Sequence, residues 1–481
     1  MKQLIKLLAV AIVVGLTLTG CMKEYTITVE SNNTDWGTTE GSGVYMEGTS
    51  VKISAFPKSG YYFIKWDDNV TDNPRTIQVT GNATYTAYFS NDPNGGGMGG
   101  DTNSTDPLTM SGTISSNVTW ADRGLSVDYI IEGNLTIDGN ALLTIAPGVT
   151  IMFTGTNGGI YVGENAGLRM VGTPDNPIVL QGPTNNPNNG SWKCVNVTSN
   201  RSDNQFEYVR FVRGGSLTGD GDGVVYVTGK LSMKHCTVDG SLSNGMACSE
   251  GAFSAFEDNI VKNCAGYPLY SETPISICKG LGSGNSFTNC AGGNVVFVAF
   301  ASLPMTENLT LANIGFPYRM RDGLFLEGNK SFTVEAGVVV EMAANKDIYI
   351  DDNTFVANGT SDSPIIFRCA ESGEHWNGIN ITNNKNNSLS YCQIQNCGTD
   401  DVHGDRQCLR LHDGTKVSLT NNTFGPSAYY GISIDYIGDM SNVTHSGNSY
   451  TGCAAGNVLV EGGGFYGGQE YEDGDVLDDL P

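Results

Sequence analysis

The sequence predicts an all-β protein whose larger part is a right-handed parallel β-helix, a solenoid built from short strands. The first observation is an internal duplication: the stretch from Leu135 to Val197 recurs from Leu324 onward, with Thr144 corresponding to Thr333. The second is that each copy consists of short apolar runs separated by Gly, Asn, Asp or Pro. No long window after the N-terminus has the apolar period of an α-helix. Repeated short strands that stack on one another are typical of a solenoid, and parallel crossovers favour the right hand.

A cysteine motif indicates the length of one coil. NIVKNCA begins at Asn259, and the similar NSFTNCA begins at Asn285, 26 residues later. We predict that the solenoid covers residues 108–463, in two related halves of about 108–305 and 306–463. At about 23 residues per coil this length gives roughly fifteen coils.

The N-terminus predicts a secretory signal over residues 1–20, because a positive start is followed by a short apolar run. The run ends in LTGC, which resembles the lipobox of bacterial lipoproteins (Bacteroidota-like). In that family the matching residue, Cys21, is acylated. The resemblance therefore implies a lipidated N-terminus at residues 21–24, with palmitate on Cys21. We expect the protein to be anchored to the outer membrane through this lipid, exposed at the cell surface, without crossing the bilayer. The alternative is an ordinary signal peptide with a chance cysteine.

Residues 25–89 predict a small β-grasp-like repeat module of five short strands, among them YTITVE and SVKISA. Its expected core is Ile27, Val29, Val51, Ile53, Phe63 and Trp66. The pattern GTTEGSGVYMEGTSVKISAFPKSGYYFIKWDD resembles the divergent internalin-type repeat of bacterial cell-surface proteins. The resemblance implies a fold and carries no chemistry. Residues 90–107 predict a flexible Gly/Asn linker.

The solenoid also resembles a known group. LTIAPGVTI, GTPDNPIVL, Trp192 and YVRF follow the pattern of bacterial surface proteins with right-handed β-helix repeats, although Ala336 replaces the proline in the second copy. This resemblance implies fold and location more than a reaction. The acidic, aperiodic tail 464–481 is expected to be disordered or only loosely docked.

The charge excludes one class of partner. The formal net charge is −24, while only 16% of the residues are charged. A strongly acidic chain does not favour nucleic acid or anionic lipid surfaces.

Some polysaccharide lyases and glycoside hydrolases have a β-helix fold, and their motifs would mark an active site here. Asp400, Asp401 and His403 match a polygalacturonase pattern only weakly, and the remaining motifs are missing. If the protein is an enzyme, these residues with Asp405 are the candidates. We expect no catalytic residues.

Two acidic, Gly-rich loops are candidates for calcium. GGSLTGDGDGVVYV from Gly214 aligns with NCGTDDVHGDRQCLRL from Asn396, so each half places such a loop at the same point of its coil. Closely spaced carboxylates on a bent backbone supply oxygen ligands. The candidate ligands are Asp220, Asp222, Asp400, Asp401 and Asp405. Neither loop has a complete calcium motif, and a solvated acidic turn is the alternative. The loops are predicted to lie roughly 40 Å apart.

With Cys21 assigned to lipid, eleven of the twelve cysteines remain. Most are predicted to be free thiols buried in the coil, with Cys264–Cys290 as the pair that adjacent coils place within disulfide reach.

Three functions stay open. The first is binding or adhesion to a glycan or a partner surface, the second is polysaccharide cleavage, and the third is a passive spacer. Aromatic stripes would favour binding, and carboxylates on adjacent coils an enzyme. A featureless face would favour the spacer.

Overall fold

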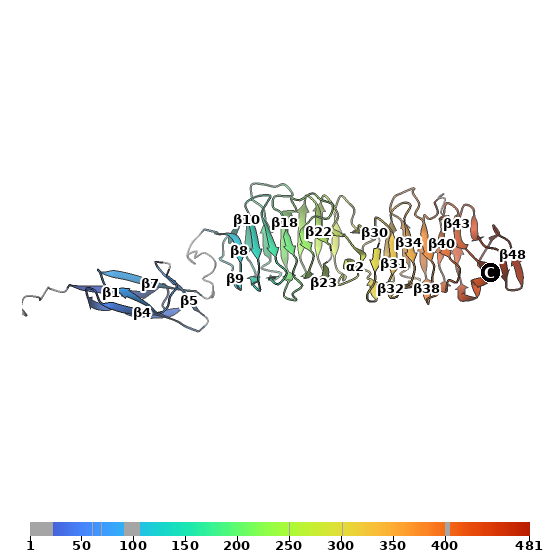
Figure 1. The fold of residues 1–481 in the computed structure, drawn as a ribbon. Helices are drawn as coiled ribbons and strands as arrows, with labels where there is room; N and C mark the ends of the chain where they lie inside the picture. Colours follow the sequence, from blue (N-terminus) through green and yellow to red (C-terminus); the bar gives the residue numbers. More distant parts are fainter. Residues whose placement is uncertain are drawn as a thin grey trace, which may run out of the picture. The chain divides into compact units, whose positions relative to one another are not determined.

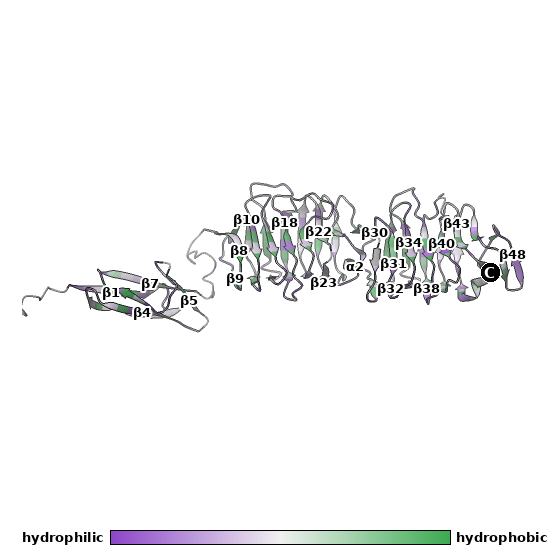
Figure 2. Cartoon of the chain, in the orientation of Figure 1, coloured by the Kyte–Doolittle hydropathy of each residue, from purple (hydrophilic) through white to green (hydrophobic). Residues whose placement is uncertain are grey.

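The structure is a computed structural model that describes residues 23–59, 61–68, 70–90, 106–249, 251–300, 302–399 and 405–481. These residues divide into two compact units: the first contains the described residues up to Ser90 together with Asn117–Thr119, and the second contains the remaining described residues from 106 to 481. The predicted signal peptide, Cys21 and nearly all of the linker lie outside the described residues. Figure 1 shows both units, and Figure 2 shows that apolar residues follow their strands.

The first unit is a small β module with more strands than predicted. It contains β1 (Glu24–Ser31), β2 (Gly37–Glu40), β3 (Gly43–Met46), β4 (Ser50–Pro57), β5 (Tyr62–Trp66), β6 (Arg75–Gln78) and β7 (Ala83–Ser90). The sheets have the orders β3-β1-β7-β5 and β2-β4-β6. The short strands β2 and β3 lie in a Gly-rich stretch that composition alone assigns to turns. Five of the six expected core residues are buried, and Phe63 is half-buried against them.

The second unit is a parallel β-solenoid of about 13 turns with three strands per coil. In its first half, face B contains β12 (Thr150–Phe153), β15 (Ile178–Gln181), β18 (Val209–Gly214), β21 (Thr237–Ser241), β24 (Ile260–Cys264) and β26 (Ser286–Thr288). Face A contains β13 (Gly159–Val162), β16 (Val195–Val197), β19 (Gly223–Val227), β22 (Asn244–Cys248), β25 (Leu269–Ser271) and β27 (Val296–Val298). Face C contains β9 (Val118–Trp120), β11 (Leu142–Ile145), β14 (Gly167–Val171), β17 (Gln205–Glu207), β20 (Lys230–Lys234) and β23 (Ala252–Glu257). The longer β8 (Leu108–Ile114) and β10 (Tyr129–Ile137) bend from face B into face A.

The second half continues face A with different strands. Face A now contains β30 (Tyr318–Met320), β33 (Val339–Met342), β36 (Ile365–Cys369), β39 (Cys392–Ile394), β42 (Thr423–Phe424) and β45 (Ser449–Tyr450). A second sheet, face D, contains β28 (Ser302–Pro304), β31 (Leu324–Glu327), β34 (Asp347–Ile350), β37 (Gly378–Ile381), β40 (Gln407–Leu411), β43 (Tyr430–Ile434) and β46 (Gly456–Val460). A third, face E, contains β29 (Leu309–Leu311), β32 (Ser331–Val334), β35 (Thr354–Asn358), β38 (Asn387–Ser390), β41 (Val417–Thr420) and β44 (Val443–Ser446).

The two halves are out of register by one face. In the duplicated sequence β33 corresponds to β12, and β34 corresponds to β13. Strand β12 lies in face B, but β33 continues face A because β27 pairs with β30 and β30 with β33. The shift occurs where a short helix, α2 (Pro274–Ile277), follows β25 in place of a face C strand. Equivalent positions of the two halves therefore lie on different faces.

Coil length explains the difference between the predicted and observed numbers of coils. Leu108 pairs with Tyr129, a coil of 21 residues, whereas Leu180 pairs with Phe211, a coil of 31 residues. The predicted fifteen coils are too many because several coils carry long turns.

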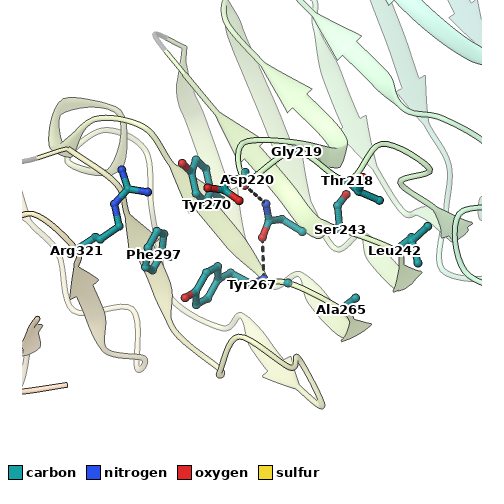
Figure 3. A pocket seen from close by; sticks show the side chains of 12 residues that line it. Thr218, Gly219, Asp220, Leu242, Ser243, Ala265, Tyr267, Tyr270, Phe297 and Arg321 are labelled. Carbon is teal, nitrogen blue, oxygen red and sulfur yellow. Dashed lines mark hydrogen bonds between the residues drawn. The ribbon is translucent and has the colours of Figure 1, made fainter. Parts of the chain in front are cut away.

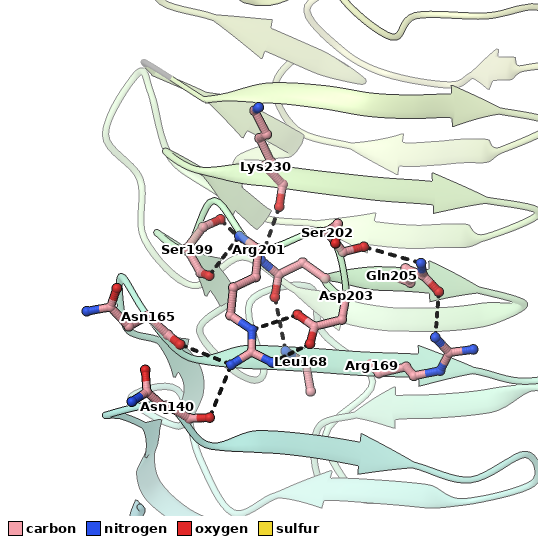
Figure 4. A network of polar contacts seen from close by, with 11 residues as sticks. Asn140, Asn165, Leu168, Arg169, Ser199, Arg201, Ser202, Asp203, Gln205 and Lys230 are labelled. Carbon is pink, nitrogen blue, oxygen red and sulfur yellow. Dashed lines mark hydrogen bonds and ion pairs between the residues drawn. The ribbon is translucent and has the colours of Figure 1, made fainter. Parts of the chain in front are cut away.

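Buried polar side chains connect neighbouring coils. The amide of Asn204 accepts from Leu168 N at 3.0 Å and donates to Ser199 O at 3.1 Å. Beside it, Arg201 pairs with Asp203 and donates to backbone carbonyls of two other coils (Figure 4). Such contacts satisfy the backbone groups that leave the sheets at the turns.

The expectation of a disordered or loosely docked tail is wrong. Strands β47 (Gly464–Tyr466) and β48 (Gln469–Tyr471) form a hairpin after the 3₁₀ helix η1 (Ile437–Asn442) and β46. Strand β49 (Val476–Leu477) pairs antiparallel with β46, and Leu480 is buried. A few apolar residues suffice to dock the tail on the last coil.

The eleven cysteines of the described chain are all unbridged, and all but Cys278 and Cys453 are buried. Cys264 and Cys290 lie on adjacent coils, where the interaction between the two thiols, together with burial, raises the pKa of Cys264. This agrees with the prediction that most of the cysteines are free thiols in the coil.

Candidate functional site

An aromatic column runs along the outside of face A in the first half. Outward side chains of consecutive coils stand directly above one another because their strands pair in register. From one coil to the next, these side chains are Tyr161, Asn196, Tyr226, Ala247, Tyr270 and Phe297. We call this set the aromatic column.

The end of the aromatic column that contains Tyr270 and Phe297 forms an apolar cluster outside the coil. The ring of Phe297 stacks on Tyr267 with centroids 4.1 Å apart and on Tyr270 with centroids 5.5 Å apart. Tyr226 and Tyr267 are half-buried and pack against Ala247, Tyr270 and Phe297. Tyr270 and Phe297 are buried within this cluster, so Tyr226 and Tyr267 are the rings that remain half-exposed at its edge.

A pocket of about 370 Å³ opens beside this cluster. Its lining consists of Thr218, Gly219, Asp220, Leu242, Ser243, Asn244, Ala265, Gly266, Tyr267, Tyr270, Phe297 and Arg321. Figure 3 shows Tyr267, Phe297 and Arg321 on one side of the pocket and Thr218 and Leu242 on the other. The volume is within the range of small-molecule sites.

A buried asparagine holds the pocket together. Asn244 donates to the backbone oxygens of Asp220 at 2.7 Å and Asp222 at 2.8 Å, and its side-chain oxygen accepts from Tyr267 N at 2.8 Å. One side chain thus fixes the acidic loop against the turn that carries the aromatic ring. Because Asn244 is buried, these hydrogen bonds are protected from water.

Three buried polar atoms of the pocket and the aromatic column have no hydrogen-bond partner among the described residues. They are the hydroxyl oxygen of Ser243, a residue only 8% exposed, and the Tyr161 hydroxyl and Asn196 side-chain oxygen of the aromatic column. A buried polar group without a partner costs about 1–3 kcal/mol. These atoms are themselves covered by the protein, so this cost is carried within the fold.

The charges at the pocket are mixed. Arg321 lies 3.5 Å from Asp322 and over the ring of Phe300. Burial raises the pKa of Tyr270 and of Tyr226, so both keep a neutral hydroxyl at physiological pH. The pocket offers hydrogen-bonding groups of both kinds beside an aromatic surface.

The predicted calcium ligands are only partly at this site. Asp220 lines the pocket, while a side-chain oxygen of Asp222 accepts from Gly219 N at 2.7 Å and closes its own turn. In the second half Asp405 accepts from Asn377 at 2.9 Å. Asp400 and Asp401, like His403, lie outside the described residues.

No group of three His, Cys, Asp or Glu side chains is arranged for a metal within the described ranges. The calcium site therefore stays a prediction. The expectation that both loops stand at the same point of the coil is wrong for the folded chain. Because the halves are shifted by one face, the loop after β18 joins faces B and A, and the loop after β39 joins faces A and D.

Sequence reasoning missed Tyr226, Tyr267, Tyr270, Phe297 and Arg321. Their signal was present, since tyrosines at outward positions of VVYV and LYS leave the core to the neighbouring residues. What the sequence did not show was which coils bring them together.

A second group of polar residues, which we call the ionic ladder, lies on face D. Asp435 accepts from His412 at 2.7 Å and from Arg410 at 2.8 Å, and Arg410 also pairs with Glu461 at 3.0 Å. Burial would raise the pKa of Asp435, but His412 and Arg410 hold it below its usual value. Burial raises the pKa of Glu461.

Comparison with family models agrees with this architecture. Residues 27–93 match the divergent InlB B-repeat domain, 112–228 the pectate-lyase like beta helix domain, and 294–468 the right handed beta helix region. The chain carries an InlB-type repeat and right-handed β-helix regions. This confirms the predicted resemblance to the internalin-type repeat and to right-handed β-helix repeats, and the predicted fold class. No curated protein and no solved structure matches the chain significantly. No helix of the described chain is long and apolar enough to span a membrane.

Proposed function

We propose that the solenoid binds glycan through the aromatic pocket of face A, and that lipid on Cys21 displays it at the outer surface of the outer membrane. The observation that carries the binding proposal is the outward cluster of Tyr267, Tyr270 and Phe297 beside a pocket. The anchoring part rests on the lipobox resemblance of the N-terminus.

A sugar ring suits this pocket chemically. One face of a pyranose presents C–H groups that pack against an aromatic ring, while its edge carries hydroxyls. Tyr267, half-buried and stacked on Phe297, supplies the ring, and Asp220 and Arg321 supply acceptor and donor groups.

The alternatives fit less well. A passive spacer does not need an apolar cluster outside its coil. A flat protein partner would bury about 1,200–2,000 Å² of surface in total, whereas this site is a single pocket of about 370 Å³. The carboxyl pair Asp435 and Glu461 on adjacent coils does not suit cleavage, because the Arg410 guanidinium pairs with both carboxylates and occupies the place of the scissile oxygen.

Glycan-array screening of the mature ectodomain, followed by calorimetry on the best ligand, tests binding. We expect Tyr267→Ala to weaken binding at least about tenfold, equivalent to about 1.4 kcal/mol, through the lost stacking. Tyr349→Ala is the matched control, because Tyr349 is a half-buried, stacked tyrosine on face D. Equal effects of both substitutions would contradict the site. A reducing-sugar release assay on the same ligands tests the enzyme alternative, and activity lost on Glu461→Gln or Asp405→Asn would replace the binding proposal.

The anchor has its own test. Cys21→Ser should abolish labelling with a palmitate analogue and release the protein from the membrane fraction. Retention of label and membrane association in this variant would show that the lipoprotein proposal is wrong.

A further inference from the structure

We propose that Cys264 and Cys290 form a disulfide that links two adjacent coils of the solenoid when the chain folds in an oxidising compartment. The structure shows the reduced pair. The proposal goes beyond glycan binding and does not depend on it.

The two cysteines occupy the same position of consecutive coils. Strands β24 and β26 pair in parallel register with Lys262 opposite Thr288, so that Cys264 stands opposite Cys290. The amide of Ala291 donates to Cys264 O at 2.9 Å, which continues this register past the ends of the strands. Paired strands lie about 4.8 Å apart, and the Cα atoms of a disulfide are usually about 4.4–6.8 Å apart.

The two thiols also have the same orientation. Asn263 and Asn289, which precede the cysteines, both have a left-handed backbone, with φ of 60° and 55°. Each Sγ atom lies near the carbonyl oxygen two residues earlier in its own coil, at 3.5 Å for Cys264 and 3.6 Å for Cys290. A bridge requires Cβ atoms about 3.5–4.5 Å apart, so the two coils need to approach by roughly half an ångström at this point.

The pair encloses the coil in which the two halves of the solenoid shift by one face. Between the two cysteines, α2 takes the place of a face C strand, and Phe256 pairs with Leu281 through an isolated bridge. A coil with a shorter hydrogen-bonded ladder opens more easily than its neighbours. A covalent link across this coil offsets that weakness and also restricts the unfolded chain.

The turns that follow the two cysteines belong to the pocket. Gly292 N donates to Gly266 O at 3.0 Å, and the Tyr267 ring packs on Gly292, where an added Cβ would lie 2.6 Å from the ring. The disulfide would therefore hold the turn that carries Tyr267 against the turn of the next coil.

The second half offers a natural comparison. The equivalent column there contains Cys397, Ser427 and Cys453 on three consecutive coils. The two cysteines are two coils apart, about 10 Å, which is beyond disulfide reach. In the first half Ser241 precedes the two cysteines of the column, so their thiols are adjacent.

The oxidant that the proposal requires is the disulfide of a thiol oxidoreductase or of glutathione. One cysteine thiolate attacks this disulfide, forms a mixed disulfide and releases one thiol of the oxidant. The second thiolate attacks the mixed disulfide, closes the bond between the two coils and releases the other thiol. The pair loses two electrons and two protons, and the oxidant is reduced to two thiols. Because both cysteines are buried in the folded coil, the bridge forms while the coil is folding.

Mapping of the thiols in the full mature protein tests the proposal. The reduced, unfolded chain is refolded with equal reduced and oxidised glutathione, blocked with N-ethylmaleimide, and digested without reduction. We expect a bridge between Cys264 and Cys290, and alkylated Cys397 and Cys453. Reduction of this protein with dithiothreitol should lower the melting midpoint by at least about 5 °C and accelerate hydrogen exchange around Gly292.

Two variants localise the effect. Cys290→Ser should lose both the bridge and the response to dithiothreitol, while Cys453→Ser, the matched control in the second half, should keep both. The mapping and the comparison with dithiothreitol use the unsubstituted chain, so they decide the question even if Cys290→Ser fails to fold.

Three results would overturn the proposal. Alkylation of both Cys264 and Cys290 after refolding would show that no bridge forms. A bridge between Cys397 and Cys408 in its place would show that the wrong pair was chosen. A bridge at the proposed site whose reduction changes neither the midpoint nor the exchange would show that it does not stabilise the coil.

Discussion

The two halves of the solenoid share an inner structure and differ on the outside. At equivalent points Trp192 and Trp376 are fully buried, and each indole N–H donates to a backbone carbonyl, at 2.9 and 2.8 Å. The outward positions have diverged. Tyr226, Ala247 and Tyr270 of the aromatic column correspond to Arg410, Ser433 and Leu459 of face D.

This difference shows which residues serve the fold and which serve a site. Inward residues and turn residues are constrained by stacking on the next coil, so both copies keep them. Outward residues carry no such constraint. In the first half they build an aromatic column, and in the second half the ionic ladder. The one-face shift places these two surfaces on different sides of the coil.

The largest expected effect tests the shared interior. Trp192→Ala and Trp376→Ala should each lower the free energy of unfolding by about 3–5 kcal/mol, because each leaves a large cavity and an unpaired carbonyl. Since each coil contacts only its neighbours, hydrogen exchange should accelerate mainly in the mutated half. Trp→Phe at each site is the milder control. A loss of less than about 1 kcal/mol of unfolding free energy at either site would contradict the claim that the two halves share this interior.

The second effect tests an internal asparagine pair present in both halves. Asn259 accepts from Cys236 N at 3.0 Å and donates to Met233 O and the Asn285 side chain. Asn422 repeats this pattern with Cys392 N, Leu389 O and Asn448.

Asn259→Ala and Asn422→Ala should each cost about 2–3 kcal/mol, because buried backbone groups lose their partners. Chemical denaturation measures this cost. Asn358→Ala, at an exposed position bonded to Ser388, is the control and should change little. Unequal costs would show that the halves differ inside as well.

The inside of the solenoid could be predicted from sequence, because the duplication marks the same apolar residues twice. The aromatic column could not, because coils differ in length. Tyr226 follows Tyr161 by 65 residues and Tyr270 follows Tyr226 by 44, although each step is two coils. No fixed period reveals that spacing.

The face shift was equally hidden, since it depends on β27 pairing with β30 at a junction without repeat character. The acidic loop was singled out from its composition, and it does form a pocket wall. The predicted role of this loop was calcium binding. In the structure the loop has a structural role, because Asn244 hydrogen-bonds its backbone to the turn that carries Tyr267.

The third effect concerns the ionic ladder and pH. The pKa of Asp435 is lowered in the folded protein, so its stabilisation is present above the unfolded pKa and is lost as pH falls through the folded value. The pKa of Glu461 is raised, so its contribution is present below the unfolded pKa and is lost as pH rises through the folded value. Stability of the last coils should therefore peak between the unfolded pKa values of Asp and Glu, at about pH 4.

Asp435→Asn should cost about 1.5 kcal/mol near the peak and remove the loss at low pH. Glu461→Gln should reduce the loss of stability at pH values above the maximum. Thermal melts across pH, with exchange measured at β43 and β46, give both results. Glu272→Gln, at the equivalent position of the first half, is the control and should leave the low-pH limb in place. An unchanged pH profile for Asp435→Asn would show that the ladder does not stabilise these coils.

The smallest expected effect concerns calcium at the duplicated acidic loops. One Asp222 oxygen already accepts from Gly219 N, and Asp220 is exposed, so any calcium bound by the first loop is held weakly. At a concentration about ten times its dissociation constant, a ligand adds about 1.4 kcal/mol, which is a shift of a few degrees for a chain of this size. We expect the melting midpoint of the mature protein to rise by no more than this with calcium, compared with chelator. Asp220→Asn with Asp222→Asn should remove the part that belongs to the first half, and Asp405→Asn should not. An identical midpoint with calcium and with chelator would remove the metal, and the loops would then differ only as a pocket wall in one half and a turn in the other.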